Sequence, residues 1–422
     1  MKHVLLGNGP AGVIAAESIR KYAAGDEITL VGDEPEPPYS RMAIPYLLSG
    51  RIDEAGTYLR KGADHYREKG ITLRRGRARA VDTAARKVVF EDGAVLPFDR
   101  LLIATGSQPA RLPIAGADQP GVHPCWTLAD ARQIMQRAAP SARVLQIGAG
   151  FIGCIILQAL VDRGVSLTVV EMGDRMVPRM MGQAAGTMIR RWVESKGIRV
   201  FTATRVEAIE PAASGALTVC LSNGEKVTAD LVISATGVKP NIGFLAGSGI
   251  ACGQGVLADA QMQTSVDGIY AAGDCAEAFD PMLGRHVVSA IQPNAADQAL
   301  CAAMNMIGRR ATQRCVTQIN VLDTLGLISA SFGNWEGVAG GDHAERRDDR
   351  NYRLIRLEFG GDVLVGANTI GLTEGVGVLR GLIQSRVPLG RWKERLMADP
   401  LALGEAYLSC AQAQSSWGLK AA

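Results

Sequence analysis

The sequence predicts an α/β protein that contains two similar βαβ modules and a C-terminal α+β module. Two observations support the repeated modules. A short apolar run ends in a glycine-rich turn at residues 7–12 and again at residues 148–153, and each turn leads into apolar residues at helical spacing. A third observation supports the last module: beyond residue 310, short apolar runs alternate at strand spacing, and two helical stretches follow at about residues 375–384 and 401–413.

The first glycine-rich turn belongs to the stretch Lys2–Gly12, which reads KHVLLGNGPAG. In a GxGxxG turn of this kind, Gly7 makes the tight turn, Gly9 lets a pyrophosphate approach the backbone, and Gly12 lets the helix pack closely on the strand. The helix that follows presents free N–H groups and the positive end of its dipole at the same place. The stretch therefore predicts a phosphate-binding turn.

The residues after this helix extend the pattern. A second apolar strand, Ile28–Val31, follows, and the acids Asp33 and Glu34 come about 20 residues after the last glycine. A carboxylate at that position accepts hydrogen bonds from a ribose hydroxyl. Turn, helix, strand and acid together predict a Rossmann-like unit that binds an ADP moiety.

The same pattern returns in the second module. Val144–Gly153 reads VLQIGAGFIG, and a strand at Ser166–Val170 leads to Glu171. Each module also contains a later β-rich segment with a hairpin signal, Asp-Gly or Asn-Gly. The residues in register are Gly93, Asp99, Thr105, Gly106 and Pro109 in the first module, and Gly224, Asp230, Thr236, Gly237 and Pro240 in the second. This correspondence indicates an internal duplication.

A third motif precedes the C-terminal module. Gly268–Ala276 reads GIYAAGDCA, a short strand that ends at Gly273 and Asp274, and Pro293 then opens a further helix. Within the C-terminal module we expect the charged segment Asp342–Asn351 to form a loop between strands.

Length and composition bound the class of protein. A chain of 422 residues is long enough for two or three domains. We expect one domain from residues 1–110 and 247–311, a second from 111–246 and a third from 312–422. The net charge of +3 is too small to predict nucleic-acid binding, and no apolar run is long enough to span a bilayer. The five histidines are scattered, and the eight cysteines form no CxxC pair, which argues against a metal site and favours a reducing, cytoplasmic location.

The two glycine cradles, the two segments ending in ATG, the GIYAAGDCA motif and the C-terminal module occur in one fixed order. In this combination the chain resembles the FAD- and NAD(P)-dependent pyridine nucleotide-disulfide oxidoreductase superfamily over essentially its whole length. Within it, Pro37–Gly50, PPYSRMAIPYLLSG, resembles the ferredoxin, rubredoxin and nitrite reductase branch, whose members carry a similar Tyr-x-Arg or Tyr-x-Lys stretch beside the flavin.

The resemblance implies that the first cradle holds FAD. The residues it implies are Gly7, Gly9, Pro10, Ala11 and Gly12 at the pyrophosphate, Asp33 or Glu34 at the adenosine ribose, Arg41 at the phosphates or ring edge, Thr105 and Gly106 beside the isoalloxazine, Gly273 and Asp274 at the ribityl chain, and Pro293 at the start of a helix that points at the flavin pyrimidine. A helix N-terminus there would stabilise the negative charge of a reduced flavin.

The resemblance also implies that the second cradle holds the nicotinamide cofactor. The residues it implies are Gly148, Gly150, Phe151, Ile152, Gly153, Glu171, Thr236 and Gly237. Glu171 can accept hydrogen bonds from both ribose hydroxyls but would repel a 2′-phosphate, so we expect NADH to be preferred over NADPH. NADPH stays an alternative, since Arg175 or Arg179 could reach its 2′-phosphate if the loop that carries them folded back.

Two departures from the superfamily concern its usual reactive groups. The early Cys-x4-Cys pair of the disulfide reductases is absent, and Met42 stands where some relatives carry a single redox cysteine. Tyr46 and Ile155 replace a Lys and a Glu that form an ion pair in many oxygenase-type ferredoxin reductases. Tyr46 is therefore the one catalytic candidate, as a ring stacked near the nicotinamide or flavin, although packing alone is the favoured interpretation.

The resemblance implies an FAD-dependent NADH:acceptor oxidoreductase, in which hydride passes from the nicotinamide C4 to flavin N5 and electrons then pass to an iron-sulfur protein such as a ferredoxin or rubredoxin. Alternatives are an NADH oxidase, a quinone or persulfide reductase, and an NADH-responsive redox-sensing interaction protein. The basic run Leu73–Arg79 and the segment Asp342–Asn351 could dock an acidic carrier, although a solvated face is favoured. A homodimer is a further expectation.

Overall fold

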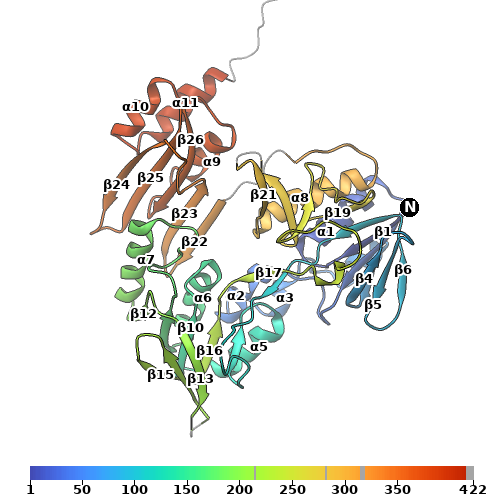
Figure 1. Cartoon of the computed structure of the whole chain (residues 1–422), viewed down its shortest axis with the longest axis horizontal. Coiled ribbons are helices and arrows are strands. Elements are labelled where there is room, and N and C mark those ends of the chain that lie inside the picture. Colours follow the sequence, from blue (N-terminus) through green and yellow to red (C-terminus); the bar gives the residue numbers. More distant parts are fainter. Residues whose placement is uncertain (213–214, 281–282, 314–318, 415–422) are drawn as a thin grey trace, which may run out of the picture. The chain divides into compact units, whose positions relative to one another are not determined.

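The computed structural model describes residues 1–212, 215–280, 283–313 and 319–414, with the side chains of 411–414 left aside (Figure 1). These residues form two compact units. Of the described residues, the first unit contains 1–110, 126–128, 238–280 and 283–313, and the second contains 111–125, 129–212, 215–237 and 319–414. Residues 319–414, which lie within the expected C-terminal domain, therefore group with the second glycine-rich module.

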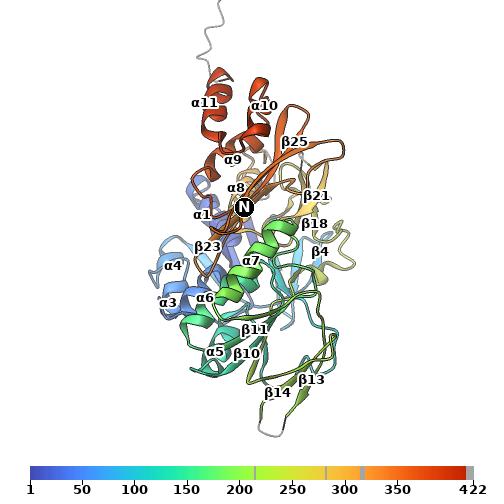
Figure 2. The ribbon, with the colours of Figure 1, turned by 90° about the vertical axis from the view of Figure 1, so that its left-hand side faces the viewer.

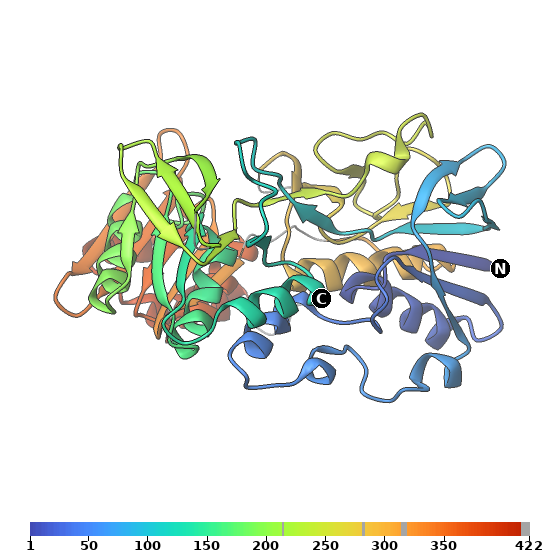
Figure 3. The same cartoon turned by 90° about the horizontal axis from the view of Figure 1, so that it is seen from below.

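The first unit is built around a five-stranded parallel sheet in the order β19-β7-β1-β2-β3. Its strands are β1 (Lys2–Leu6), β2 (Glu27–Gly32), β3 (Ile71–Arg75), β7 (Arg100–Ile103) and β19 (Ile269–Ala271). Helices α1 (Pro10–Tyr22) and α8 (Gln292–Met306) lie side by side beside this sheet (Figure 3). The sheet is parallel because each strand is reached through a crossover connection.

An antiparallel sheet forms the third layer of this unit. Its strands are β4 (Ala78–Asp82), β5 (Lys87–Phe90) and β6 (Val95–Pro97). Val88 and Phe90 of β5 are fully buried and share one apolar core with Leu5 of β1 and Ile19 of α1. Apolar side chains of all three layers are therefore buried in one core, which stabilises the packing of the layers.

The remaining elements of the first unit are short. The strands are β8 (Ser107–Pro109), β17 (Val238–Pro240), β18 (Val256–Ala258), β20 (Ala276–Asp280) and β21 (Arg285–Val288). The helical pieces are η1 (Arg41–Ala43), α2 (Ile44–Leu48), α3 (Glu54–Thr57), α4 (His65–Glu68) and η2 (Gly243–Leu245). β8 and β17 pair antiparallel, and β18, β20 and β21 form a small sheet.

The second unit has a parallel sheet in the order β12-β11-β10-β16-β9, in which the first four strands repeat β3-β2-β1-β7 and the edge strand β9 comes from a segment that precedes them in the chain. The strands are β9 (Val122–Pro124), β10 (Arg143–Ile147), β11 (Ser166–Val170), β12 (Arg199–Phe201) and β16 (Leu231–Ser234), and the helices are α5 (Leu128–Arg137), α6 (Phe151–Asp162) and α7 (Gln183–Ser195). The antiparallel layer is β13 (Val206–Pro211), β14 (Leu217–Leu221) and β15 (Lys226–Ala229).

The predicted duplication extends to hydrogen bonds. The Asp99 carboxylate accepts from the backbone N–H of Lys2 at 2.7 Å, and the matching Asp230 accepts from that of Arg143 at 2.8 Å. Each bond joins the first residue of the central strand, β1 or β10, to the residue directly before the neighbouring strand, β7 or β16. Two Rossmann-like modules in an α/β chain are therefore confirmed.

The C-terminal residues form a five-stranded antiparallel sheet in the order β22-β23-β26-β25-β24, with helices packed on it (Figure 1). The strands are β22 (Ile319–Thr324), β23 (Leu327–Gly333), β24 (Asp342–Asp348), β25 (Arg353–Gly360) and β26 (Val363–Ile370), and the helices are α9 (Val376–Gln384), α10 (Arg391–Ala398) and α11 (Leu403–Gln414). None of the helices formed by the described residues is long and apolar enough to cross a bilayer.

The expectation of a charged loop over residues 342–351 was wrong for its first seven residues, which form the edge strand β24. Only Ala344 of this strand is buried, so no apolar alternation marks it in the sequence. An edge strand needs a partner on one side only and is commonly charged, which prevents pairing with other chains. Helix α10 was missed for a related reason, since Leu396 is its one buried residue.

Candidate functional site

The first glycine-rich turn joins β1 to α1, and two of its glycines lie too close to backbone oxygens to carry a side chain. Gly7 has φ +115°, and a Cβ there would lie 1.9 Å from the Ala104 carbonyl oxygen; one at Gly12 would lie 1.8 Å from the Gly7 oxygen. A Cβ at Gly9 would meet nothing within 4 Å. Helix α1 begins directly after Gly9, with Pro10 in its first turn and no side-chain cap. The turn thus offers an uncapped helix N-terminus, which suits an anion.

The structure brings the third motif to this turn. A Cβ at Gly273 would lie 3.4 Å from the Ala11 Cβ and 3.6 Å from the Ala295 Cβ, so it sits between the first turns of α1 and α8. The Gly273 N–H donates to the buried Gln298 side-chain oxygen at 2.8 Å. Helix α8 carries Pro293 in its first turn and has no side-chain cap. Two uncapped helix starts therefore converge beside Gly273.

Asp274 is the acidic group of this cluster. Ser107 Oγ donates to its carboxylate at 2.8 Å. Burial raises the pKa of Asp274, while the Ser107 hydrogen bond and the charge of Arg41 act in the opposite direction. On the neighbouring segment, Thr105 Oγ1 donates to the Asn241 oxygen at 2.7 Å, and Gly106 has φ +65°. The ATG segment and the GDC motif are thus joined through Ser107.

Arg41 is held between an acid and a ring. Its Nη2 lies 2.8 Å from Glu34 Oε1, its Nη1 donates to the Ser107 oxygen at 3.2 Å, and its guanidinium carbon lies 5.0 Å from the centre of the Trp126 ring. Tyr39 OH donates to Glu34 Oε2 at 2.6 Å. Of the two acids expected at a ribose, Glu34 is therefore bonded to Arg41 and Tyr39, whereas Asp33 is exposed.

Two of the residues expected to depart from the superfamily pattern face solvent, and Ile155 is half-buried. Met42 is 48% exposed and Tyr46, on α2, is 53% exposed. Cys275, beside Asp274, is fully buried and its Sγ donates to the Ile103 and Ala272 oxygens at 3.3 and 3.4 Å. Burial raises the pKa of this thiol, so it is a poor nucleophile. The role expected of Tyr46 beside a ring stays a prediction.

The second glycine-rich turn has the same construction. Gly148 has φ +99°, and a Cβ there would lie 2.5 Å from the Ala235 oxygen; one at Gly153 would lie 2.4 Å from the Gly148 oxygen. A Cβ at Gly150 would meet nothing within 4 Å. Helix α6 starts at Phe151, without a side-chain cap. The other residues expected to contact the nicotinamide cofactor are half-buried. They are Phe151 and Ile152 at the start of α6, and Thr236 and Gly237 in the second ATG segment.

Glu171 is fixed against this second turn. It is 9% exposed, its Oε2 accepts from the Ala149 N–H at 2.7 Å, and its Oε1 accepts from the Gly173 N–H at 2.7 Å. Of the arginines considered for a 2′-phosphate, Arg175 already donates to the Met181 and Pro178 oxygens. Arg179 is exposed, and its Nη1 lies 3.9 Å from where a Cβ of Gly237 would stand.

Sequence reasoning missed several residues that hold the site together. They are Ser107, Trp126, Gln298 and the pair Ser40 and Gln292, whose side chains are joined by a 3.1 Å hydrogen bond. Ser107 directly follows the ATG motif, which was a usable signal. The others lie in a linker, mid-helix or at a helix start, where the sequence pattern gives no sign of a contact.

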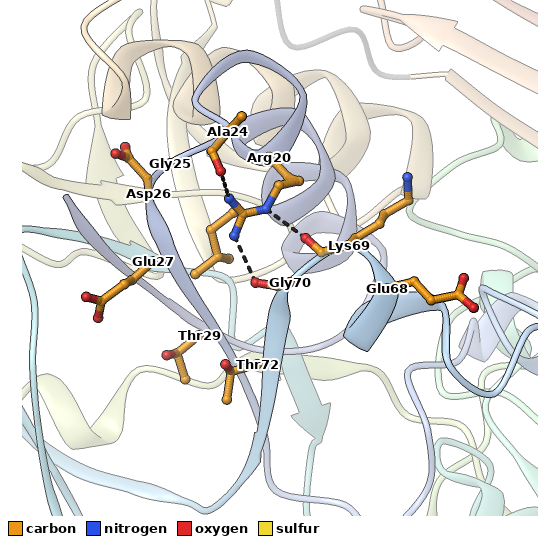
Figure 4. A pocket seen from close by; sticks show the side chains of 11 residues that line it. Arg20, Ala24, Gly25, Asp26, Glu27, Thr29, Glu68, Lys69, Gly70 and Thr72 are labelled. Carbon is orange, nitrogen blue, oxygen red and sulfur yellow. Dashed lines mark hydrogen bonds between the residues drawn. The ribbon is translucent and has the colours of Figure 1, made fainter.

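A separate cavity of about 520 Å³ lies at the other end of the first parallel sheet, where β2 and β3 begin (Figure 4). Arg20 lines it and donates to the backbone oxygens of Lys69, Ala24 and Gly70 at 2.5–2.8 Å. Dinucleotides bind such sheets at the carboxyl ends of the strands, so we do not place a nucleotide at this opposite end. Among the described residues, no group of three His, Cys, Asp or Glu side chains is placed to hold a metal ion.

Comparison with known proteins identifies relatives of the chain. A family model described as pyridine nucleotide-disulphide oxidoreductase matches residues 1–299. The epsilon subunit of an NADH-dependent phenylglyoxylate dehydrogenase from Aromatoleum evansii is 31% identical over 411 residues, which cover 97% of each chain. Rubredoxin-NAD(+) reductase from Pseudomonas putida is 30% identical over 311 residues, 73% of this chain and 80% of the relative.

Among solved structures, a chain of the covalent putidaredoxin reductase-putidaredoxin complex matches with a TM-score of 0.90 and 25% identity, over 97% of this chain and 99% of that one. The sequence resemblance to the superfamily and to its ferredoxin and rubredoxin reductase branch is thus confirmed. Because the family model matches residues 1–299 and a relative is 31% identical over 97% of each chain, the chain belongs to the pyridine nucleotide-disulphide oxidoreductase family.

Proposed function

We propose that the protein is an FAD-dependent NADH:acceptor oxidoreductase that passes electrons to an iron-sulfur protein of the ferredoxin or rubredoxin kind. The observation that carries the proposal is the pair of uncapped glycine turns, one in each unit, in which Gly9 and Gly150 leave open space. Two such turns fit two dinucleotides. The first unit would hold FAD and residues 129–237 would hold NADH.

The residues of the first turn fit FAD. The N-termini of α1 and α8 supply positive ends of helix dipoles, which favour phosphates and the anionic side of a flavin. Asp274, as an acceptor beside Ser107, suits a hydroxylated chain. When bound, FAD supplies a group that takes up two electrons and releases them singly. The chain's own part is binding and orientation, so no acid–base pair is required of it.

The acceptor is inferred from relatives. One relative is named as a rubredoxin reductase, and the chain with the TM-score of 0.90 comes from a complex of a reductase with putidaredoxin. Met42 and the buried Cys275 support direct transfer without a thiol relay, because neither offers an exposed thiolate. A cytoplasmic location and a homodimer stay predictions.

The test is anaerobic titration of the purified yellow protein. We expect NADH to bleach the flavin absorbance stoichiometrically, and a ferredoxin or rubredoxin to restore it faster than quinones, persulfides or oxygen do. A protein without flavin, or one that NADH leaves oxidised, would contradict the proposal. Fast reoxidation by oxygen alone would identify an oxidase instead.

A second candidate function differs in the protein that accepts the electrons. One relative, which matches over 97% of its length, is named as a subunit of an NADH-dependent dehydrogenase. This favours an acceptor that is a tightly bound partner subunit and not a free carrier. Purification from the native source distinguishes the two, because a subunit co-purifies at a fixed ratio with the polypeptide that reoxidises it.

Glu171 allows a test of nucleotide preference. Glu171→Gln removes the negative charge but keeps one oxygen for the backbone N–H groups of the turn. We expect the ratio of kcat/KM for NADPH to that for NADH to rise about 10-fold, since a 2′-phosphate no longer meets a carboxylate. Stopped-flow reduction with both cofactors measures the ratio. The control is Glu194→Gln, an exposed acid of α7, which should leave the ratio unchanged.

A further inference from the structure

Helix α7 lies between the second parallel sheet and the C-terminal sheet (Figure 2). Near its end, Trp192 Nε1 donates to the Thr324 and Leu325 oxygens at 3.0 and 3.1 Å, and its ring lies edge-on to Tyr352 at 5.0 Å. The helix buries Met188, Ile189 and other apolar residues of one face. The C-terminal sheet is therefore docked on the nucleotide module through this helix and through α6, which contacts β22.

At the start of the same helix, Asn368 makes a second connection. It lies on β26 and is 1% exposed. Its Oδ1 accepts from the Gly182 N–H at 2.9 Å, and its Nδ2 donates to the Met180 oxygen at 3.1 Å. A buried amide that satisfies one donor and one acceptor of a loop fixes the course of that loop, because losing either bond leaves a buried polar group unpaired.

The loop that Asn368 holds, residues 172–182, begins directly after Glu171. At its other side, the Val177 N–H donates to the Ala149 oxygen at 2.8 Å, within the second glycine turn. Val177 has φ +51°, which is costly for a β-branched residue and persists only when the surroundings hold it. The loop thus connects the glycine turn to the C-terminal sheet.

We propose that Asn368 is a positioning residue through which the C-terminal sheet holds the 172–182 loop, and with it Glu171, in place for the adenosine half of the nicotinamide cofactor. This inference rests on the proposed function of the second turn. It gives the C-terminal sheet a part in nucleotide binding, although that sheet contains no nucleotide motif. Asn368 acts through the loop and does not itself contact the cofactor.

The test uses two halves of the cofactor as probes on the FAD-loaded protein. ADP-ribose carries the adenosine half, and reduced nicotinamide mononucleotide carries only the reacting half. Calorimetric titration gives the Kd of ADP-ribose, and stopped-flow absorbance gives the rate of flavin reduction by the mononucleotide. We expect Asn368→Leu to raise the Kd of ADP-ribose about 10-fold and to leave reduction by the mononucleotide within about twofold.

The matched control is Trp192→Phe, which removes the bonds to Thr324 and Leu325 at the other end of α7 but leaves the loop untouched. It should lower the melting temperature and leave the Kd of ADP-ribose unchanged. If Asn368→Leu does not fold, Asn368→Asp replaces it, since a carboxylate keeps the bond from the Gly182 N–H but cannot donate to the Met180 oxygen; a raised Kd is then expected again.

An unchanged Kd in the Asn368 variants would overturn the inference, and so would an equal rise in Trp192→Phe, which would mean that docking alone matters. Both results leave NADH-driven reduction of the wild-type flavin intact, so the proposed function survives them. A wild-type protein that binds neither ADP-ribose nor NADH would end both.

Discussion

Gly12→Ala is expected to yield a protein that purifies without flavin. Its free energy of unfolding should be lower than that of the wild type by at least about 4 kcal/mol. The added Cβ would lie 1.8 Å from the Gly7 oxygen and 3.0 Å from Leu30 Cδ1. Backbone on one side and a buried strand residue on the other cannot yield, so α1 must move away from β1. Urea unfolding followed by circular dichroism, and the absorbance of bound flavin, measure the two effects.

The matched control lies three residues earlier. A Cβ at Gly9 meets nothing within 4 Å, so Gly9→Ala should fold with nearly wild-type stability. If the open space beside Gly9 is where phosphate lies, the same substitution should still weaken FAD binding. A Gly9→Ala protein that retains full FAD affinity would argue that the pyrophosphate lies elsewhere, and a stable Gly12→Ala protein would show that the helix start can shift.

Asp274→Ala is expected to lower FAD affinity by about 10- to 100-fold, because hydrogen bonds to a charged group contribute about 1.5–3 kcal/mol. Asp274 is the acceptor at the point where the ATG segment, the GDC motif and the start of α8 meet. Fluorescence of released flavin during dialysis measures the loss. The control is Asp267→Ala, an exposed acid before β19, which should leave FAD affinity unchanged.

The same residue predicts a pH dependence of the flavin-free protein. Burial raises the pKa of Asp274 above its unfolded value of 3.8, so folding favours the protonated form. The stability that this group contributes is complete below pH 3.8 and is lost as the pH rises through the raised pKa. Asp274→Asn should remove that part of the slope. Identical urea midpoints for wild type and variant from acid to neutral pH would contradict the assignment.

The two glycine turns were predictable because the motif itself demands their backbone geometry. Gly7 and Gly148 have positive φ and lie against the backbone oxygens of Ala104 and Ala235, a requirement that the spacing of glycines reveals in any sequence. The in-register Asp99 and Asp230 were equally visible, since each makes the same bond to the start of a central strand.

What was not predictable depends on contacts between distant segments. Glu34 was expected at a ribose, but its partners Arg41 and Tyr39 come from a stretch without regular pattern. Asn368 lies on a strand whose sequence gives no sign of the loop it holds, about 190 residues away. Strand β24 was hidden because an edge strand with one buried residue shows no alternation.

The docking of α7 has a consequence for how the chain melts. Helices α6 and α7 of the second parallel module contact strands β22 and β26 of the C-terminal sheet, and both parts belong to one compact unit. Scanning calorimetry should therefore show two endotherms and not three, with the C-terminal sheet melting together with the second parallel sheet. Removing the last hundred residues would then lower the second endotherm itself, and an isolated C-terminal fragment would lack a transition of its own.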